Sequence, residues 1–319
     1  MNTYTPWVEK YRPTDIDNIV LDPLNKKIMN NIIKKQYFPN LLFYGPPGTG
    51  KTTSVINLIN AYQEHQNLHY NVKNKPCVIH LNASDDRGID IIRIQINNFV
   101  NAKSLFNNSM KFVILDEVDY MTKNAQQALR YLIQDYSNNI RFCLICNYIC
   151  RIDFALQNEF LKLKFCQLPK EDIYNFLYNI QEKEKLNIDK EKIIGIQTMF
   201  ESDIRSMINY IQSNSNQLKY LKKDYIITET VWLNFSEKIK KNITKKNITI
   251  YISEISKKYN IERKTFIKKY IKFLINKDKR VYNDEWFKML SFIIHNIDVK
   301  EDYIIDYFIS KFLELYKLL

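Results

Sequence analysis

Eight consecutive residues, Gly45-Pro-Pro-Gly-Thr-Gly-Lys51-Thr52, have the types and the spacing needed to hold a chain of phosphates. They match the pattern GxxxxGK[ST], in which glycines let successive backbone amides turn toward the phosphates and a lysine neutralises phosphate charge. The chain has only five glycines, and three of them, Gly45, Gly48 and Gly50, fall within this run. We therefore expect Lys51 to contact the β- and γ-phosphates of a nucleotide and Thr52 to bind magnesium.

Two adjacent carboxylates follow an apolar run in Phe112-Val-Ile-Leu-Asp116-Glu117. A run of this kind predicts a buried strand, and ligands of open α/β sheets bind at the carboxyl ends of the strands. Asp116 is then placed to hold the magnesium shell, and Glu117 to orient or deprotonate an attacking water. A solvated acidic strand end is the alternative, which the intact phosphate-binding loop makes the weaker interpretation.

Two polar residues farther along the chain could complete this site. Asn147 follows the apolar run from Phe142 to Cys146, where its amide could position water or sense the nucleotide. A turn residue is the alternative there. Arg205 lies in Asp203-Ile-Arg-Ser-Met, within a predicted helix, and a plain surface arginine is its alternative.

The elements that must position these residues alternate between strands and helices over the first half of the chain. Short apolar runs separated by helical patterns are typical of a parallel α/β sheet. The predicted strands are Leu41–Tyr44, Cys77–Leu81, Phe112–Leu115, Phe142–Cys146 and, as an edge strand, Leu161–Phe165. From Pro169 onward, apolar spacings of three and four predict helices almost throughout.

We predict three units: an α/β nucleotide-binding core over residues 1–168, a helical lid over residues 169–225, and an all-helical C-terminal domain over residues 226–319. The C-terminal domain interleaves lysines with large apolar residues at helical spacing. The lysines are predicted to form solvated helix faces, with a surface for DNA or a partner as the alternative. The apolar positions, predicted to bury against other helices, are Phe266, Ile267, Tyr270 and Ile271.

Composition limits the remaining possibilities. Hydrophobic residues at 45% and charged residues at 26% are typical of an ordered globular protein. The net charge of +12 favours a nucleic-acid partner, although a lysine-rich composition alone is the alternative. Because the chain shows no signal peptide and no apolar run of about 18 residues, we expect an intracellular protein.

Cys143 and Cys146 form a CxxC pair. Such a pair can belong to a redox or zinc site, but it lies within an apolar run, and no second pair follows at ligand spacing. Buried thiols are the favoured interpretation.

Longer motifs resemble those of one family. Together with the phosphate-binding loop and its acids, they resemble the AAA+ ATPases and, more closely, the small subunits of replication factor C, the eukaryotic clamp loader. The resemblance covers roughly residues 6–212, and the C-terminal block is similar only in length and helicity. The motifs are Trp7-Val-Glu-Lys-Tyr-Arg-Pro13, Leu81-Asn-Ala-Ser-Asp-Asp-Arg-Gly-Ile-Asp90, Ala125-Gln-Gln-Ala-Leu-Arg130 and Phe142-Cys-Leu-Ile-Cys-Asn-Tyr148.

This resemblance implies ATP and Mg²⁺ as cofactors. It makes Asn147 the first sensor and Arg205 the second sensor, carried by the lid, and it places both with Glu117 and Lys51 in the catalytic set. Thr52 and Asp116 are the implied metal residues. The implied nucleotide-binding residues are Val8, Arg12, Val20, Gly45, Pro46, Pro47, Gly48, Thr49, Gly50, Lys51, Thr52, Thr53, Asn147 and Arg205.

The resemblance also implies an assembly. The chain is expected in a hetero-pentameric ring, joined by the C-terminal domains, that uses ATP to load a sliding clamp onto primer-template DNA. Its ATPase activity in isolation is expected to be low, and its location is the nucleus or another site of DNA replication, such as a viral factory. Core arginines would touch DNA phosphates rather than base edges, and the candidates are Arg87, Arg93 and Arg130.

Two other functions stay open. One is a nucleotide-binding scaffold subunit of the same ring with little turnover, against which Glu117 argues. The other is an AAA+ ATPase of DNA repair or recombination, for which we find no DNA-translocating pore loop in the sequence.

One position departs from the family pattern. The segment after Asn147 ends in the family with Ser-Arg-Cys, whose arginine reaches the ATP site of the neighbouring subunit, whereas Asn158-Glu159-Phe160 stands here. A carboxylate cannot stabilise charge on a transferring phosphoryl group, and loss of an arginine finger can cost on the order of 10³ to 10⁵ in rate. The chain is therefore expected to receive catalytic help without giving it, and Lys162 and Lys164 are poor substitutes.

Overall fold

A computed structural model describes residues 5–70, 78–83, 94–99, 110–136, 140–186, 188–215, 227–240, 244–259, 261–277, 281–296 and 299–316. The chain forms two compact units. The first comprises Met1–Ile188 and Phe200–Lys219, and the second comprises Asp189–Met199 and Tyr220–Leu319. Each unit has a hydrophobic core of its own.

A parallel sheet of five strands forms the centre of the first unit. Its order is β2-β3-β4-β1-β5, and all neighbouring strands run parallel. The strands are β1 (Leu41–Tyr44), β2 (Val78–Asn82), β3 (Lys111–Asp116), β4 (Ile140–Cys146) and β5 (Leu161–Lys164). The predicted parallel α/β sheet is confirmed, and β5 lies at its edge as predicted.

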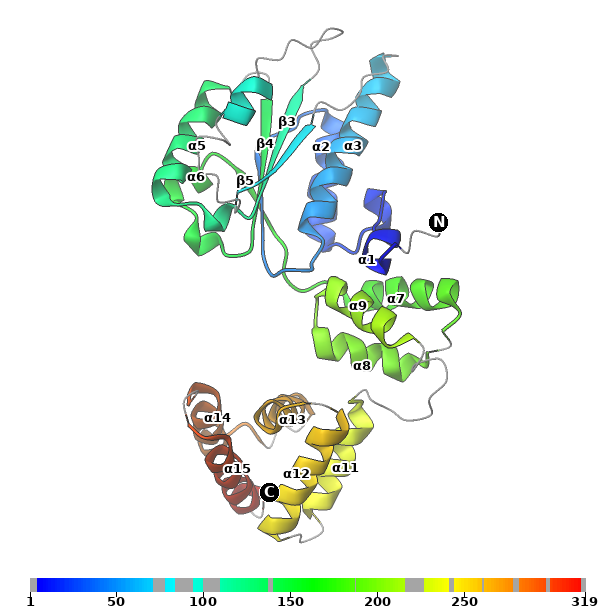
Figure 1. Ribbon diagram of the computed structural model, residues 1–319, viewed down its shortest axis with the longest axis vertical. Coiled ribbons are helices and arrows are strands. Elements are labelled where there is room, and N and C mark those ends of the chain that lie inside the picture. Colours follow the sequence, from blue (N-terminus) through cyan, green and yellow to red (C-terminus); the bar gives the residue numbers. More distant parts are fainter. Residues whose placement is uncertain are drawn as a thin grey trace. The chain divides into compact units, whose positions relative to one another are not determined.

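Helices cover both faces of this sheet (Figure 1), because successive strand residues point to opposite sides. Phe43 packs on one side with α2 (Pro23–Lys35) and α3 (Lys51–Tyr70). Leu42 packs on the other side with α5 (Lys123–Asp135) and α6 (Phe154–Gln157). Loops follow the carboxyl ends of the strands, and ligands of such sheets bind among these loops.

The first unit also contains several short helices and two helices of the predicted lid. Pro169 directly precedes α7, and Asp203 caps α9 by accepting a hydrogen bond from the Ser206 amide at 3.0 Å. These elements are α1 (Trp7–Lys10), η1 (Ile16–Asn18), η2 (Val118–Tyr120), η3 (Ile149–Arg151), α7 (Lys170–Glu184) and α9 (Ile204–Ser213).

The second unit is helical, as predicted. It contains most of α8 (Lys190–Phe200) together with α11 (Glu229–Lys240), α12 (Lys245–Tyr259), α13 (Arg263–Lys277), α14 (Asp284–His295) and α15 (Glu301–Tyr316). The predicted core positions are confirmed, since Phe266, Ile267, Tyr270 and Ile271 are all buried. Aromatic rings surround Tyr270, and its hydroxyl lies 2.9 Å from the Ser236 hydroxyl.

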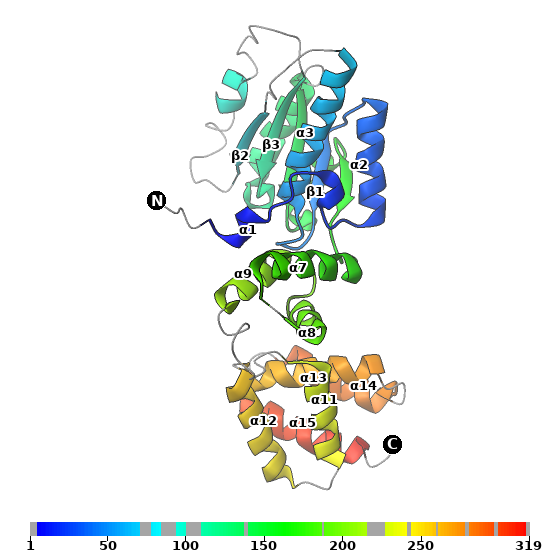
Figure 2. The same cartoon turned by 90° about the vertical axis from the view of Figure 1, so that its right-hand side faces the viewer.

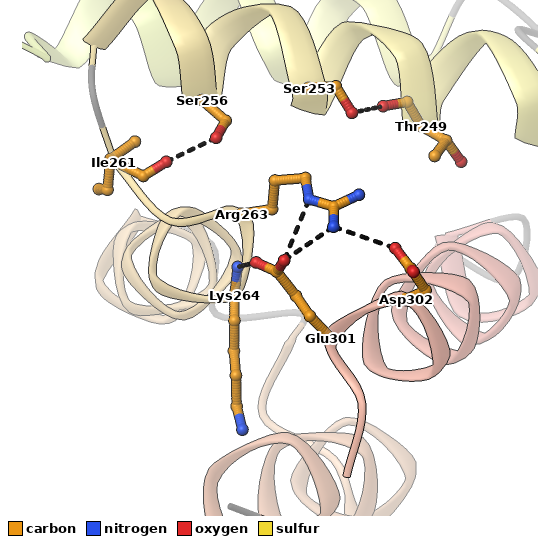
Figure 3. Close-up of polar contacts among 8 residues, drawn as sticks. All are labelled: Thr249, Ser253, Ser256, Ile261, Arg263, Lys264, Glu301 and Asp302. Atoms are coloured by element: carbon orange, nitrogen blue, oxygen red, sulfur yellow. Dashed lines mark hydrogen bonds and ion pairs between the residues drawn. The ribbon is translucent and has the colours of Figure 1, made fainter.

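One carboxylate joins the beginnings of two helices in this unit (Figure 3). Glu301, the first residue of α15, accepts hydrogen bonds from Arg263 Nε at 3.2 Å and Nη2 at 2.8 Å. Its other oxygen accepts from the Lys264 amide at 3.0 Å, so it caps the N-terminus of α13. Asp302 adds a second ion pair to Arg263 at 3.0 Å. This link between α13 and α15 was not predicted from the sequence.

The predicted boundaries at residues 168 and 225 stay predictions, and residues 216–226, around the second boundary, lie outside the described residues. Within the described parts of the chain, no helix combines the length and the apolar character needed to cross a membrane.

Candidate nucleotide-binding site

The loop between β1 and α3 has a backbone that only glycine can adopt at two positions. Gly45 has a φ of 142°, and a Cβ atom there would lie 1.7 Å from the Phe165 carbonyl oxygen. Gly48 has a φ of 72°, and a Cβ atom there would lie 1.8 Å from Asp203 Oδ1. The loop is therefore packed against the end of β5 and the beginning of α9. Its glycines allow contacts that a side chain would prevent.

Lys51, the first residue of α3, is buried with 7% of its surface exposed. Its Nζ donates to the carbonyl oxygens of Gly45 at 2.7 Å and Pro46 at 2.8 Å, and to Asn147 Oδ1 at 2.9 Å. Burial lowers the pKa of Lys51, although the Asp116 charge opposes that shift. An ammonium that donates to oxygen acceptors in a phosphate-binding loop is suited to donate to phosphate oxygens instead.

Thr52 and Asp116 form the oxygen pair predicted for magnesium. Thr52 Oγ1 donates to Asp116 Oδ2 at 2.9 Å, and His80 Nε2 lies 3.8 Å from the same carboxylate oxygen. Burial raises the pKa of Asp116, but the nearby His80 imidazole and the hydrogen bonds from Thr52 and the Glu117 amide outweigh it and lower the pKa overall. A hydroxyl beside an ionised carboxylate is the donor set that Mg²⁺ accepts, so these residues fit that ion.

These residues border one cavity of about 210 Å³. Its walls come from the N-terminal segment, the phosphate-binding loop, the ends of β3 and β4, and helices α7 and α9. Of the predicted nucleotide-binding and catalytic residues, the cavity is lined by Val8, Arg12, Val20, Pro47, Gly48, Thr49, Gly50, Lys51, Thr52, Thr53, Asp116, Glu117, Asn147 and Arg205. Gly45 and Pro46 instead contact Lys51 through their carbonyl oxygens.

Several largely apolar residues of this cavity were not predicted. Apart from Ile145 on β4, they come from the N-terminal segment and from helices α7 and α9, and they are Tyr11, Pro13, Ile19, Ile145, Phe176, Ile204 and Ile208. Phe176 and Ile208 follow ordinary helical spacing, which does not separate a pocket wall from a core position. Tyr11 and Pro13 belong to the N-terminal motif, which was the one available signal.

Asp119 is a second omission. It is 5% exposed, and its Oδ2 accepts hydrogen bonds from the backbone amides of Asn147 at 3.3 Å and Tyr148 at 3.2 Å. The carboxylate thus ties the turn after β3 to the turn after β4 and holds the backbone that aims Asn147 at Lys51. Among the described residues, its Oδ1 is buried and has no hydrogen-bond partner.

Replacing Asp119 by alanine is expected to lower the free energy of unfolding of the first unit by about 1–3 kcal/mol, because two amides lose their acceptor in a buried place. Asp119→Asn should cost less, since an amide oxygen can still accept both bonds. Urea denaturation followed by circular dichroism measures this, with the exposed Asp135→Ala on α5 as control. Equal losses for Asp119→Ala and Asp135→Ala would contradict the assigned contact.

Of the three predicted DNA contacts, the structure describes one. Arg87 and Arg93 lie outside the described residues. Arg130, on α5, is half-buried, and its Nε donates to Glu159 Oε1 at 3.3 Å. Glu159 Oε1 also accepts from Gln134 Nε2 at 2.8 Å. The residue at the arginine-finger position is therefore held by α5 of its own chain.

The two cysteines of the CxxC pair are free and buried in β4. Cys143 packs on the face of the sheet covered by α2 and α3, and Cys146 packs on the opposite face. Burial raises the pKa of Cys146 to about 12. Thiols on opposite faces of a sheet cannot bind one metal ion together, which agrees with the prediction of buried thiols.

Comparison with known proteins shows what this fold and site are similar to. Residues 41–168 match the family described as "ATPase family associated with various cellular activities (AAA)". The chain carries an AAA ATPase domain. The matched residues contain all five strands of the sheet, with β1 at the start of the match and β5 near its end. Binding of a nucleotide follows from the AAA domain.

Several proteins that are similar to about two thirds of this chain are subunits of replication factor C. The chain is 38% identical over 208 residues to replication factor C subunit 3 of Schizosaccharomyces pombe, covering 65% of this chain and 59% of that protein. It is 38% identical over 225 residues to subunit 5 of Homo sapiens, covering 70% and 64%. The small subunit of Sulfolobus acidocaldarius is 39% identical over 212 residues, covering 66% and 62%. The match thus spans about three fifths of each relative.

Solved structures agree with the fold. The RuvB Holliday junction branch migration motor of Thermotoga maritima has a TM-score of 0.52 and 16% identity, covering 83% of this chain and 91% of that chain. At this identity the likeness concerns the fold of an AAA domain followed by helices.

Proposed function

We propose that this chain is a small subunit of a clamp loader, which uses ATP binding and hydrolysis to load a sliding clamp onto primer-template DNA during replication. The observation that carries this proposal is the 35–40% identity to replication factor C subunits over about two thirds of the chain. The cavity supports it, because the N-terminal segment, whose Trp7–Pro13 motif resembles that family, forms one wall of the nucleotide site.

In this proposal, Lys51 binds the β- and γ-phosphates of ATP, and Thr52 and Asp116 hold Mg²⁺. Bound Mg²⁺ would neutralise charge on the phosphates. The loop from Gly45 to Gly50 and the first turn of α3, through Thr53, surround the phosphates with amides and the positive end of a helix. The 2.9 Å bond between Thr52 and Asp116 shows that a hydroxyl and a carboxylate converge there before any metal is added.

The catalytic roles fall to residues around the same cavity. Glu117 follows Asp116 at the end of β3 and orients or deprotonates water. Asn147, which lies 2.9 Å from Lys51 Nζ, reports the γ-phosphate to the turn after β4. Arg205 reaches the cavity from α9 and stabilises phosphate charge from the lid side. Val8, Arg12 and Val20 border the nucleotide from the N-terminal segment.

The substitution at Glu159 suggests a role for the chain within the ring. Its carboxylate is occupied by Arg130 and Gln134, so it offers no positive charge to a neighbouring ATP site. We infer that this subunit receives an arginine finger from a neighbour without supplying one, and that its ATPase activity alone is low.

The assembly follows from the same proposal. The core (1–168), the lid (169–225) and the C-terminal domain (226–319) would act as ATPase, sensor and collar of a hetero-pentamer at a site of DNA replication, such as the nucleus or a viral factory. Arg87, Arg93 and Arg130 stay the candidate DNA contacts. Arg130 would first have to leave Glu159, because its Nε donates to that carboxylate.

Affinity purification of the tagged chain from its source cells, followed by mass spectrometry, tests this function. The expected result is recovery of four further AAA subunits and, in the presence of ATP, of a sliding clamp. The recovered complex should hydrolyse ATP faster when primed DNA and the clamp are added. Recovery of the chain without other AAA subunits would sink the proposal, and a complex that ignores the clamp would favour an ATPase of repair or recombination.

A further inference from the structure

The short helix α1 is attached to two helices of the predicted lid (Figure 2). Trp7 is buried, and its backbone N–H donates to Gln212 Oε1 on α9 at 3.0 Å, across 205 residues of sequence. Lys10 Nζ and the Tyr11 hydroxyl both donate to Glu184 Oε1 at 2.5 Å. Glu184 is the last residue of α7, so α1 is held at the end of one lid helix and along another.

The residues directly after α1 are attached to the core instead. Asn57 Nδ2, on α3, donates to the Pro13 carbonyl oxygen at 2.8 Å. Ile16 and Ile19 are buried in the cluster that includes α2, α3 and the strands. The chain therefore passes from the lid to the core within a few residues, between Tyr11 and Pro13.

This crossing stretch is also a wall of the nucleotide cavity. Val8, Tyr11, Arg12 and Pro13 line the cavity from one side, while Arg205 lines it from α9. Anything that fixes α1 on the lid consequently fixes the position of this wall relative to Arg205 and the phosphate-binding loop.

Of the two contacts to Glu184, we expect the bond from Tyr11 to stabilise the position of α1 more than the bond from Lys10. The Lys10 side chain is 49% exposed, and an ion pair that faces water contributes little. The Glu184 side chain is only 18% exposed, and a phenol that donates to a shielded carboxylate forms a strong, charge-assisted bond. Burial raises the pKa of Glu184, but the hydrogen bonds from Lys10 and Tyr11 outweigh it and lower the pKa overall. The carboxylate is therefore ionised at neutral pH.

We propose that Glu184 is a positioning residue for nucleotide binding: it holds the Tyr11 hydroxyl and so sets the N-terminal wall of the cavity. This inference rests on the proposed nucleotide site and extends it to a lid residue that lies outside the cavity lining. It makes nucleotide affinity depend on where the lid is, because Glu184 moves with α7. Glu184→Ala should weaken binding of an adenine nucleotide by about 10-fold, as expected for loss of one charged hydrogen bond.

A double-mutant cycle on the full chain tests this. Dissociation constants for Mg·ADP are measured by calorimetry for the unsubstituted chain, Tyr11→Phe, Glu184→Ala and the double variant. Tyr11→Phe should lose as much affinity as Glu184→Ala, and the double variant should lose no more than either, since all three remove the same bond. Glu184→Gln should stay within about 3-fold of the unsubstituted chain, because its amide oxygen still accepts.

Two further readouts separate positioning from a general loss of structure. Glu171→Ala, on the exposed side of α7, serves as the matched control and should leave the affinity unchanged. In the assembled ATPase, Tyr11→Phe should act on KM rather than on kcat at saturating ATP, and Glu184→Gln should leave both nearly unchanged. These two milder variants keep the test decisive if Glu184→Ala does not fold.

The outcomes are distinguishable. Additive losses in Tyr11→Phe and Glu184→Ala, or affinities unchanged in both, would overturn the positioning role while leaving the nucleotide site intact. No nucleotide binding by the folded, unsubstituted chain would overturn the proposed function and this inference with it.

Discussion

Replacing Lys51 by alanine is expected to weaken ATP binding by about 100-fold or more, because a charged group that makes several hydrogen bonds to phosphate is removed. The substitution also leaves Asn147 Oδ1 and the carbonyl oxygens of Gly45 and Pro46 without the donor that now contacts them. These oxygens would repel the phosphates. Equilibrium titration with a fluorescent ATP analogue and Mg²⁺ measures the change.

Lys123→Ala supplies the control for Lys51→Ala, since Lys123 is an exposed lysine at the beginning of α5 in the same unit. It removes the same charge from the chain but not from the cavity. If Lys51→Ala folded normally and still bound ATP as tightly as Lys123→Ala, the assignment of the cavity to the nucleotide would be wrong.

Replacing Glu117 by glutamine should lower the rate of ATP hydrolysis by about 10²- to 10⁴-fold and change ATP affinity little. Glu117 has a φ of 57° at the end of β3 and lines the cavity beside Asp116. Glutamine has the same shape and can still hydrogen-bond water, but it cannot take up a proton. The loss should therefore appear in the chemical step and not in binding.

Single-turnover hydrolysis in the purified complex measures the effect of Glu117→Gln. Glu64→Gln, an exposed position on α3, should hydrolyse ATP at the unsubstituted rate. A normal hydrolysis rate in Glu117→Gln, with ATP bound, would assign the base to another residue. If the unsubstituted chain and Glu117→Gln both hydrolysed ATP at the same slow rate, the result would favour the scaffold function.

Local sequence patterns predicted the sheet and the phosphate-binding loop well, for physical reasons. Strands β1, β3 and β4 are short apolar runs that are mostly buried on both faces, and such runs stand out between helical patterns. Strands β3, β4 and β1 are parallel neighbours, so Asp116, Asn147 and Lys51 all lie at the carboxyl ends of the strands. Close packing at Gly45 and Gly48 explains why glycines concentrate there in a chain with so few.

Contacts made across long stretches of sequence were not predictable in the same way. Glu184 ends an ordinary amphipathic helix, and nothing in its neighbourhood indicates that Tyr11, 173 residues earlier, donates to it. Asp119 follows the acidic pair by only two residues, yet its role depends on where β4 ends in space. The bond between Glu159 and Arg130 likewise requires α5 and the segment after α6 to meet. Such contacts depend on tertiary packing, which composition and periodicity do not encode locally.

Calorimetric titration of the folded, full-length chain with Mg·ATP tests the central claim most directly. The cavity bordered by Lys51, Thr52 and Asp116 predicts saturable binding of one nucleotide per chain, weakened when Mg²⁺ is chelated. The claim would be contradicted if neither Mg·ATP nor ADP gave a binding signal in the titration, both with the chain alone and with its companion subunits.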